Sequence, residues 1–188
     1  MNKAKPIELV KKKISSRPYS ILNPICRGIV GYISYLAACS GHTVYSEYIL
    51  YEPIMRIAQS KSFKVQCEYP LPKPKNDNKE NNSKRGDNKR IDFYLSKKDE
   101  EKNENIGLGI EVKWIDKKLK PKNLKNDIEK LKSFSEQKHA HGYLVLFGLD
   151  KHFEENKLKE ISKLSKSSGK KINFDGKTNY AACWFKIC

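Results

Sequence analysis

The amino-acid sequence predicts an α/β domain in which a mixed β-sheet carries helices on both faces. Two helical segments come first, three strands follow, and helices and strands then alternate to the end of the chain. Alternation of this kind is typical of helices that pack over a partly parallel sheet. The length of 188 residues suits one domain with one compact core, and no internal repeat is present.

The N-terminal part of the chain predicts a basic arm and two helices. Residues 1–18 are rich in lysine and form the expected arm, and residues 24–38 are apolar enough for a buried helix. A second helix is expected over residues 47–60, with Ser46 as its N-terminal cap. Pro53 is expected to kink this helix or to delay its start. The apolar stripe of the helix consists of Leu50, Ile54, Ile57 and Ala58.

Three strands are predicted in the middle of the chain. Residues 63–69 alternate apolar and polar side chains, which is typical of a half-buried strand. Residues 73–90 are too polar to order themselves and predict a flexible surface loop. Strands are expected at 91–95 and 106–114, joined by the charged hairpin connection 96–105. The apolar density of the third strand favours a central position in the sheet.

The C-terminal part predicts two further helices and two strands. Residues 123–138 place apolar side chains on one helical face, and residues 142–149 are almost entirely apolar. The second segment therefore reads as a buried strand parallel to the strand before the helix. The chain is expected to close with a strand over 180–188. The helix before it carries Leu158, Ile161 and Leu164.

Charge and cysteine content narrow the class of protein. The net charge is +16 and the sequence pI is about 9.5, which favours a polyanionic partner such as DNA. The five cysteines follow no disulfide or zinc spacing, so we expect a reducing, cytoplasmic location. A mean hydropathy of −0.74 excludes an integral membrane protein. Residues 28–38, followed by Cys39, imitate a lipoprotein cleavage site, but a helix packed in the core is the favoured interpretation.

The candidate chemistry lies on the second and third strands. Mg²⁺ prefers hard oxygen ligands, and Mg²⁺-assisted phosphodiester cleavage needs converging carboxylates and a nearby cation. Glu111 and Lys113 share one face of their strand because side chains at i and i+2 point the same way. Asp92 lies on the adjoining strand, so Asp92 and Glu111 are predicted metal ligands, with the Val112 carbonyl as a further ligand. Glu-x-Lys occurs four times, but only Glu111 interrupts an apolar strand. The alternative is an edge strand on which Glu111 and Lys113 pair in solvent.

With these residues the segment 44–149 resembles the PD-(D/E)XK nuclease superfamily. The resemblance implies a restriction-endonuclease-like α-β-β-β-α-β core, Asp92 and Glu111 as metal ligands, and Lys113 as the catalytic lysine. It also implies Mg²⁺ as cofactor, with Mn²⁺ as a substitute. Members often carry a glutamate on the helix before the first strand. Glu47 is preferred to Glu52 here because it shares the face of the apolar stripe, although a first-turn acid also stabilises a helix dipole. The proline of the motif is absent, since Arg90 and Ile91 precede Asp92.

The expected function is a Mg²⁺-dependent endonuclease that hydrolyses DNA in restriction or defence, mobile-element processing or repair. An RNA substrate stays open, and a homodimer or a larger nucleoprotein complex is compatible with two-strand cutting. The rival hypothesis is a catalytically silent nucleic-acid-binding module or a subunit of a larger nuclease complex. A peripheral membrane protein is a third, weaker alternative. Phosphate contacts are predicted at Lys117, Lys118, Lys120 and Lys122, for which a solvated charge run is the alternative interpretation.

Overall fold

The protein is described here from a computed structural model. Its described residues are 21–40, 46–71, 89–99, 103–117, 120–138, 140–165, 170–173 and 179–188. The predicted basic arm lies outside these residues, and so does the predicted polar loop 73–90 except for its last two residues. Of those two, Arg90 belongs to a strand, so the loop was predicted to extend too far toward the C-terminus.

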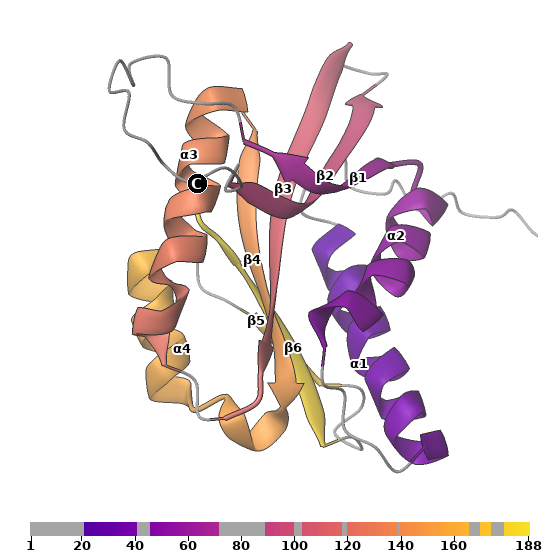
Figure 1. Ribbon diagram of the computed structural model, residues 1–188, viewed down its shortest axis with the longest axis vertical. Helices are drawn as coiled ribbons and strands as arrows, with labels where there is room; N and C mark the ends of the chain where they lie inside the picture. Colours follow the sequence, from indigo (N-terminus) through magenta and orange to yellow (C-terminus); the bar gives the residue numbers. More distant parts are fainter. Residues whose placement is uncertain are drawn as a thin grey trace, which may run out of the picture.

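The chain alternates helices and strands in the predicted general order (Figure 1). Short 3₁₀ helices, labelled η, precede three of the α-helices. The elements are α1 (Leu22–Ser40), η2 (Glu47–Leu50), α2 (Tyr51–Ser60), β1 (Lys64–Pro70), β2 (Arg90–Asp99), β3 (Glu104–Ile115), η3 (Pro121–Leu124), α3 (Lys125–Lys138), β4 (His141–Leu149), η4 (Asp150–His152), α4 (Glu155–Leu164), β5 (Lys170–Asn173) and β6 (Tyr180–Lys186).

The strands of the described chain form one mixed, six-stranded sheet in the order β1-β2-β3-β4-β6-β5. The β3–β4 pair is parallel, as the crossover through α3 predicts, and the other neighbouring pairs are antiparallel. β3 therefore lies inside the sheet, in the central position that its apolar residues predict.

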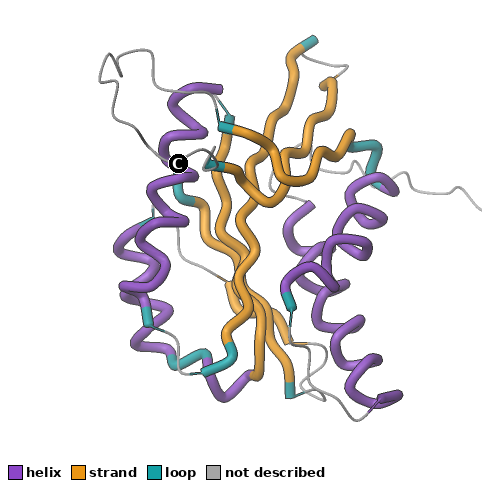
Figure 2. Tube along the Cα trace, viewed as in Figure 1, coloured by secondary structure: helices purple, strands orange, loops and turns teal. Residues whose placement is uncertain are grey.

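Helices cover both faces of the sheet, which confirms the predicted α/β class. α1 and α2 lie on one side, and α3 and α4 lie on the other (Figures 1 and 2). The sheet divides the apolar interior into two layers. Side chains of the first layer include Ile25, Ile29, Leu50, Ile54, Phe93 and Val112. Side chains of the second include Leu124, Ile128, Leu131, Phe134, Leu146 and Phe185.

The first helix confirms the interpretation of residues 28–38 as a core segment. Ile29, Val30 and Ile33 of α1 are fully buried, and α1 packs on α2 and β6. None of the described helices combines the length and the apolar composition needed to cross a membrane.

The start of the second helical segment agrees with the prediction for Pro53. Ser46 caps η2 by accepting a hydrogen bond from the Tyr48 amide, with a distance of 3.3 Å between Oγ and N. The α-helix proper begins at Tyr51, which places Pro53 in its first turn. An amide at that position has no partner within the helix, so proline is tolerated there. The proline has delayed the α-helix.

Two predictions in the sheet were wrong in extent. β2 runs to Asp99 and β3 begins at Glu104, so the hairpin connection is shorter than residues 96–105. Lys97 and Lys98 pair with β3 at the end of β2, but their side chains are exposed. This part of the strand therefore has no apolar residues from which it could be predicted. β5 was not predicted because its four residues contribute one apolar side chain, Ile172, to the core.

Candidate active site

The candidate site lies where β2 separates from β3. The antiparallel pairing of the two strands begins at Phe93 and Ile110, although β2 stays paired with β1 as far as Arg90. The C-terminal part of β3, from Glu111 onward, therefore has a free backbone edge on its β2 side. Backbone amides at such an edge need acceptors from elsewhere in the structure.

Two carboxylates accept hydrogen bonds from this edge. Oδ2 of Asp92 lies 2.7 Å from the Val112 amide nitrogen, and Oε1 of Glu47 lies 3.0 Å from the Trp114 amide nitrogen. Amides two residues apart on a strand point the same way, so the two acids line one side of β3. The arrangement brings the predicted residues Asp92 and Glu47 to the strand that carries Glu111 and Lys113.

Glu111 is the most buried ionisable residue of this group. It is 4% exposed, on a strand inside the sheet, which overturns the alternative of an edge strand in solvent. Its partner is Lys130 of α3, with 2.7 Å between Nζ and Glu111 Oε1. The Lys130 ammonium also lies 3.4 Å from Asp127 Oδ1 on the same helix. Glu111 is therefore held from the α3 side of the sheet.

Burial and charge both perturb the titration of the two strand acids. Burial raises the pKa of Glu111 to about 8, and the nearby Asp92 charge acts in the same direction, outweighing Lys130. Burial also raises the pKa of Asp92, although its bond from the Val112 amide and Lys130 oppose the shift. Glu111 is therefore largely protonated at neutral pH in the metal-free protein, and a bound cation would favour its ionised form.

Lys113 lies on the same strand as Glu111 but has a different partner. Its Nζ is 3.4 Å from Glu47 Oε1, and its side chain is about half exposed. Burial acts to lower the pKa of Lys113, but the carboxylates of Glu47 and Asp127 outweigh it and raise the pKa. Lys113 is therefore a protonated, accessible cation beside the buried acids.

The two glutamates that the sequence offers before the first strand lie in different surroundings. Glu47 reaches β3, whereas Glu52 pairs with Arg56 on the exposed face of α2, with 2.7 Å between the charged atoms. Glu47 lies in the 3₁₀ helix η2 rather than in the α-helix that the helical-face argument assumed, and its role in the site stays a prediction.

Four further residues of the site were not predicted. Lys130 and Asp127 come from α3, and Tyr51 and Glu68 come from α2 and β1. The Tyr51 hydroxyl lies 2.7 Å from Glu68 Oε1 and 3.3 Å from Asp92 Oδ1. Burial and the bond to Glu68 raise the pKa of the Tyr51 hydroxyl, so it stays a hydrogen-bond donor. Glu68 adopts a left-handed backbone with φ of 50°, in the stretch of β1 that faces Asp92.

A sequence signal existed for some of these residues. Tyr51 follows Glu47 by four positions, which is the spacing of one helical face. Asp127 and Lys130 are three apart on α3 and flank the buried residues Ile128 and Leu131. No pattern in the sequence indicates the unusual backbone of Glu68. The sequence alternates apolar and polar residues along β1, yet Val65 and Cys67 pack in the first apolar layer and Tyr69 in the second, so the strand changes face at Glu68.

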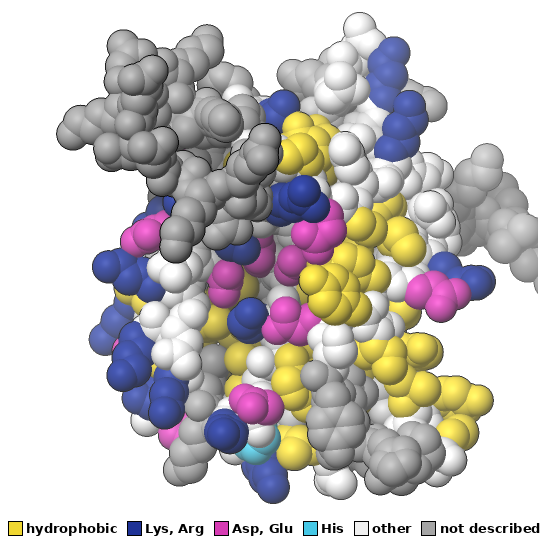
Figure 3. Space-filling model, in the orientation of Figure 1, with side chains coloured by type: hydrophobic (Ala, Val, Ile, Leu, Met, Phe, Trp, Pro, Cys, Tyr) yellow, Lys and Arg dark blue, Asp and Glu magenta, His cyan; other side chains and the backbone are white. Residues whose placement is uncertain are grey.

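The acidic and basic side chains gather on one face of the molecule. Figure 3 shows them together over the strands, in the shallow region between the α3 side and the α2 side, with hydrophobic side chains adjoining on the α2 side. In the part of the chain that the structure describes, no three His, Cys, Asp or Glu side chains are grouped in a way that could hold a metal ion. Asp92 and Glu111 have the oxygen donors that Mg²⁺ prefers, but Lys130 competes with a cation for Glu111.

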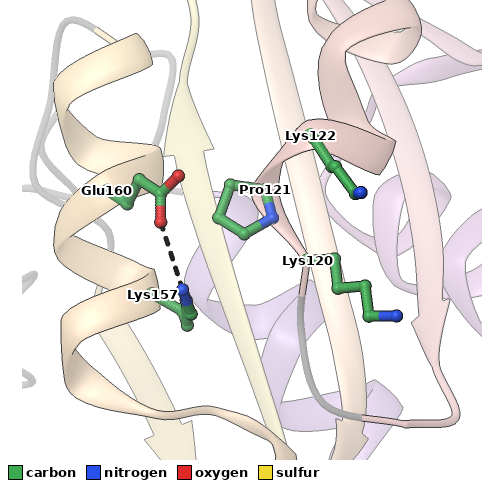
Figure 4. Close-up of a pocket in the computed structure, with 5 residues that line it drawn as sticks. All are labelled: Lys120, Pro121, Lys122, Lys157 and Glu160. Atoms are coloured by element: carbon green, nitrogen blue, oxygen red, sulfur yellow. Dashed lines mark ion pairs between the residues drawn. The ribbon is translucent and has the colours of Figure 1, made fainter.

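The predicted phosphate-binding lysines lie beyond the end of β3. Lys117, Lys120 and Lys122 are exposed, and Lys118 lies outside the described residues. Lys120 and Lys122 line a small surface pocket of about 190 Å³ between η3 and α4, together with Pro121, Lys157 and Glu160. Figure 4 shows the Lys120 and Lys122 side chains extending in the same direction, away from α4, while Lys157 pairs with Glu160 at 3.5 Å.

Comparison with protein-family models, with curated proteins and with solved structures found no match. The class that the fold defines is an α/β protein with a mixed six-stranded sheet, and the site is a cluster of carboxylates and lysines on its central strands.

Proposed function

We propose that the protein is a Mg²⁺-dependent endonuclease that hydrolyses DNA phosphodiester bonds. The observation that carries the proposal is the junction of Asp92 and Glu111 on adjacent strands, with Lys113 exposed beside them. Two carboxylates with raised pKa values and a neighbouring lysine that is paired with Glu47 but partly exposed suit a reaction in which negative charge develops on a phosphate.

The proposed core is restriction-endonuclease-like. Its support is the run α2-β1-β2-β3-α3-β4, in which the first three strands form an antiparallel meander and β4 is parallel to β3. The acidic residue and the Glu-x-Lys sequence fall on β2 and β3, as the resemblance to the PD-(D/E)XK superfamily implies.

Asp92 and Glu111 would hold the Mg²⁺ ion, with Glu47 and the Val112 carbonyl as further predicted ligands. A bound Mg²⁺ ion would lower the pKa of a water molecule and polarise the phosphate. Tyr51 orients Asp92 through its hydroxyl, and the Val112 amide fixes the other Asp92 oxygen. Lys130 lies against Glu111 and would have to give way to a cation that binds there.

Lys113 would act on the phosphate and on the attacking water. Its pKa is raised, so the side chain keeps its charge at neutral pH and can offset the charge that develops in the transition state. Glu47 pairs with the Lys113 ammonium and accepts a hydrogen bond from the Trp114 amide, so it ties Lys113 to β3. Positioning by a neighbouring carboxylate keeps a long lysine side chain in one orientation.

The net charge of +16 supports a nucleic-acid substrate, and exposed lysines such as Lys120 and Lys122 would contact phosphates without reading the sequence. The biological setting that we propose is restriction or defence, mobile-element processing or repair, in the cytoplasm.

A catalytically silent nucleic-acid-binding module is the second candidate function. It is favoured by one observation, the Lys130 ammonium 2.7 Å from Glu111, which gives the buried acid a partner within the protein. In that case Asp92 and Glu47 act as structural acceptors for the edge amides of β3.

The deciding experiment compares wild type with Glu111→Gln on supercoiled, linear, single-stranded and four-way-junction DNA, in Mg²⁺, Mn²⁺ or EDTA. We expect metal-dependent cutting by wild type and none by Glu111→Gln. Glu129→Gln is the matched control, because Glu129 is an exposed acid of α3 that pairs with Lys125. Binding of DNA without cutting by any variant would favour the silent module.

A further inference from the structure

An exposed aromatic side chain adjoins the candidate site. Tyr48 is 70% exposed, the largest value among the described exposed hydrophobic residues, and it directly follows Glu47 in η2. Its neighbour Ile49 is also exposed. Figure 3 shows hydrophobic side chains next to the acidic ones on this face of the molecule. Tyr48 and Ile49 thus place two exposed apolar side chains in succession beside the candidate site.

The Tyr48 ring is the outer end of an aromatic chain that reaches the core. Its centroid lies 5.2 Å from that of Tyr51, and the Tyr51 centroid lies 4.6 Å from that of Phe93, which is fully buried. The Tyr48 amide also bonds to the Ser46 cap. The ring therefore packs on Tyr51 and its backbone is held by the cap, while 70% of the residue stays exposed.

The same row of aromatic rings connects Tyr48 to the acids and the lysine of the candidate site. The Tyr51 hydroxyl is 3.3 Å from Asp92 Oδ1, and Glu47, adjacent to Tyr48, is 3.4 Å from the Lys113 ammonium. A strand with its phosphate at the acids and Lys113 would bring a neighbouring base near the Tyr48 ring. Bases stack on aromatic rings whatever their sequence, but only when they are unpaired.

We propose that Tyr48 is a stacking platform for an unpaired base of a DNA strand bound at the Asp92–Glu111–Lys113 site. The inference deepens the proposed function by naming the substrate class, which is DNA with unpaired nucleotides next to the phosphate that is cut. The charge balance favours this occupant, because the protein carries +16 and Lys113, which is about half exposed, pairs with Glu47, the residue before Tyr48. A second copy of the same basic chain would meet like charge.

The test measures binding rather than cutting, so it is independent of catalysis. Fluorescence anisotropy in EDTA would give the Kd of a mixed-sequence 20-nucleotide single strand and of the matched duplex, at several salt concentrations. The proteins are wild type, Tyr48→Phe, Tyr48→Ala and Tyr35→Ala. Tyr35 is the matched control, since it is a tyrosine of α1 with 63% exposure. Thermal melting of each variant checks that the fold is retained.

We expect Tyr48→Ala to weaken single-strand binding roughly tenfold, within the range for loss of one base–aromatic stack, and to change duplex binding by less than about twofold. Tyr48→Phe and Tyr35→Ala should match wild type. The salt dependence should stay the same, because stacking releases no counterions. Unchanged single-strand binding by Tyr48→Ala, or an equal loss on both substrates, would overturn the inference. So would a wild-type dimer that Tyr48→Ala converts to a monomer, because the ring would then face a second copy.

The two proposals fail in distinguishable ways. Absence of cutting with the Tyr48 effect intact would remove the nuclease and leave a single-strand-binding site. Metal-dependent cutting with no Tyr48 effect would keep the nuclease and remove the stacking platform.

Discussion

The ammonium group of Lys130 lies 2.7 Å from Oε1 of Glu111, so a residue of α3 is the charged partner of the acid that β3 buries. No other ion pair among the described residues is buried as deeply on both sides. A lysine in this place stabilises the metal-free site and competes with any cation that binds there.

Replacing Lys130 by Met should therefore show whether Lys130 competes with a cation for Glu111. In EDTA the variant should lose roughly 1–3 kcal/mol of unfolding free energy, because Glu111 and Asp127 lose their buried partner. Addition of Mn²⁺ should raise its Tm by more than it raises the wild-type Tm. Thermal melting with and without Mn²⁺ checks both values. Lys132→Met, an exposed position on the same helix, is the control. Equal increases in Tm would rule out a cation at Glu111.

The raised pKa of Glu111 predicts how stability depends on pH. The native protein keeps the Glu111 proton up to about pH 8, whereas the unfolded chain releases it near the ordinary value of 4.5. Between these values the native state binds more protons, so the unfolding free energy of wild type should fall as pH rises and level off above about 8. The slope is at most about 1.4 kcal/mol per pH unit.

Urea unfolding in EDTA from pH 5 to 9 measures this slope. Glu111→Gln has no proton to release and should show a flatter profile, and the exposed-site variant Glu129→Gln should follow wild type. A Glu111→Gln profile as steep as that of wild type would show that Glu111 titrates normally.

Lys113 should matter for cutting far more than for binding. Lys113→Met removes the accessible cation beside the acids, and we expect a loss of roughly 100-fold or more in the rate of metal-dependent cutting. DNA affinity in EDTA should change little, since one phosphate contact among many is lost. Single-turnover cutting and anisotropy measure the two effects. Lys98→Met, at an exposed position of β2, should cut normally, and an equally slow Lys98→Met would contradict a specific role for Lys113.

The strand part of the site was predictable from the sequence because strand geometry has a simple period. Alternation along residues 106–114 puts Glu111 and Lys113 on one face, and the hairpin brings Asp92, just beyond its last pair, to the Val112 amide. Helical spacing likewise distinguished Glu47 from Glu52. In each case the position follows from local repeat geometry within one element or between two strands of a hairpin.

The remaining part of the site depends on contacts between distant elements. Lys130 reaches Glu111 only because α3 crosses over β3, and the edge of β3 is open only because β2 leaves it at Phe93. The sequence predicts the crossover, but it marks neither the α3 residue that meets Glu111 nor the point at which β2 leaves β3. The backbone of Glu68, with φ of 50°, is set by tertiary context for the same reason.

The lysines beyond β3 can be tested through the salt dependence of DNA binding. If Lys120 and Lys122 both contact phosphates, the double alanine variant should reduce the slope of log K against log salt by roughly 2, at about 0.9 per contact. Lys159 and Lys163 are exposed lysines of α4, and their double alanine variant keeps the same net charge as the first. Equal reductions in the two variants would mean that the charge run acts only through net charge.

The contact between β3 and β4 next to the site leaves no room for a side chain at Gly148. A Cβ atom there would lie 2.5 Å from the carbonyl oxygen of Ile115, which is backbone and cannot rotate away. We expect Gly148→Ala to cost roughly 1–3 kcal/mol of unfolding free energy, as overpacking in a core does. In contrast, a Cβ at Gly31 of α1 meets no atom within 4 Å, so Gly31→Ala should raise stability by up to about 1 kcal/mol through helix propensity. Urea unfolding of both variants at one pH measures the difference, and a Gly148→Ala protein as stable as Gly31→Ala would show that the two strands pack less closely than described.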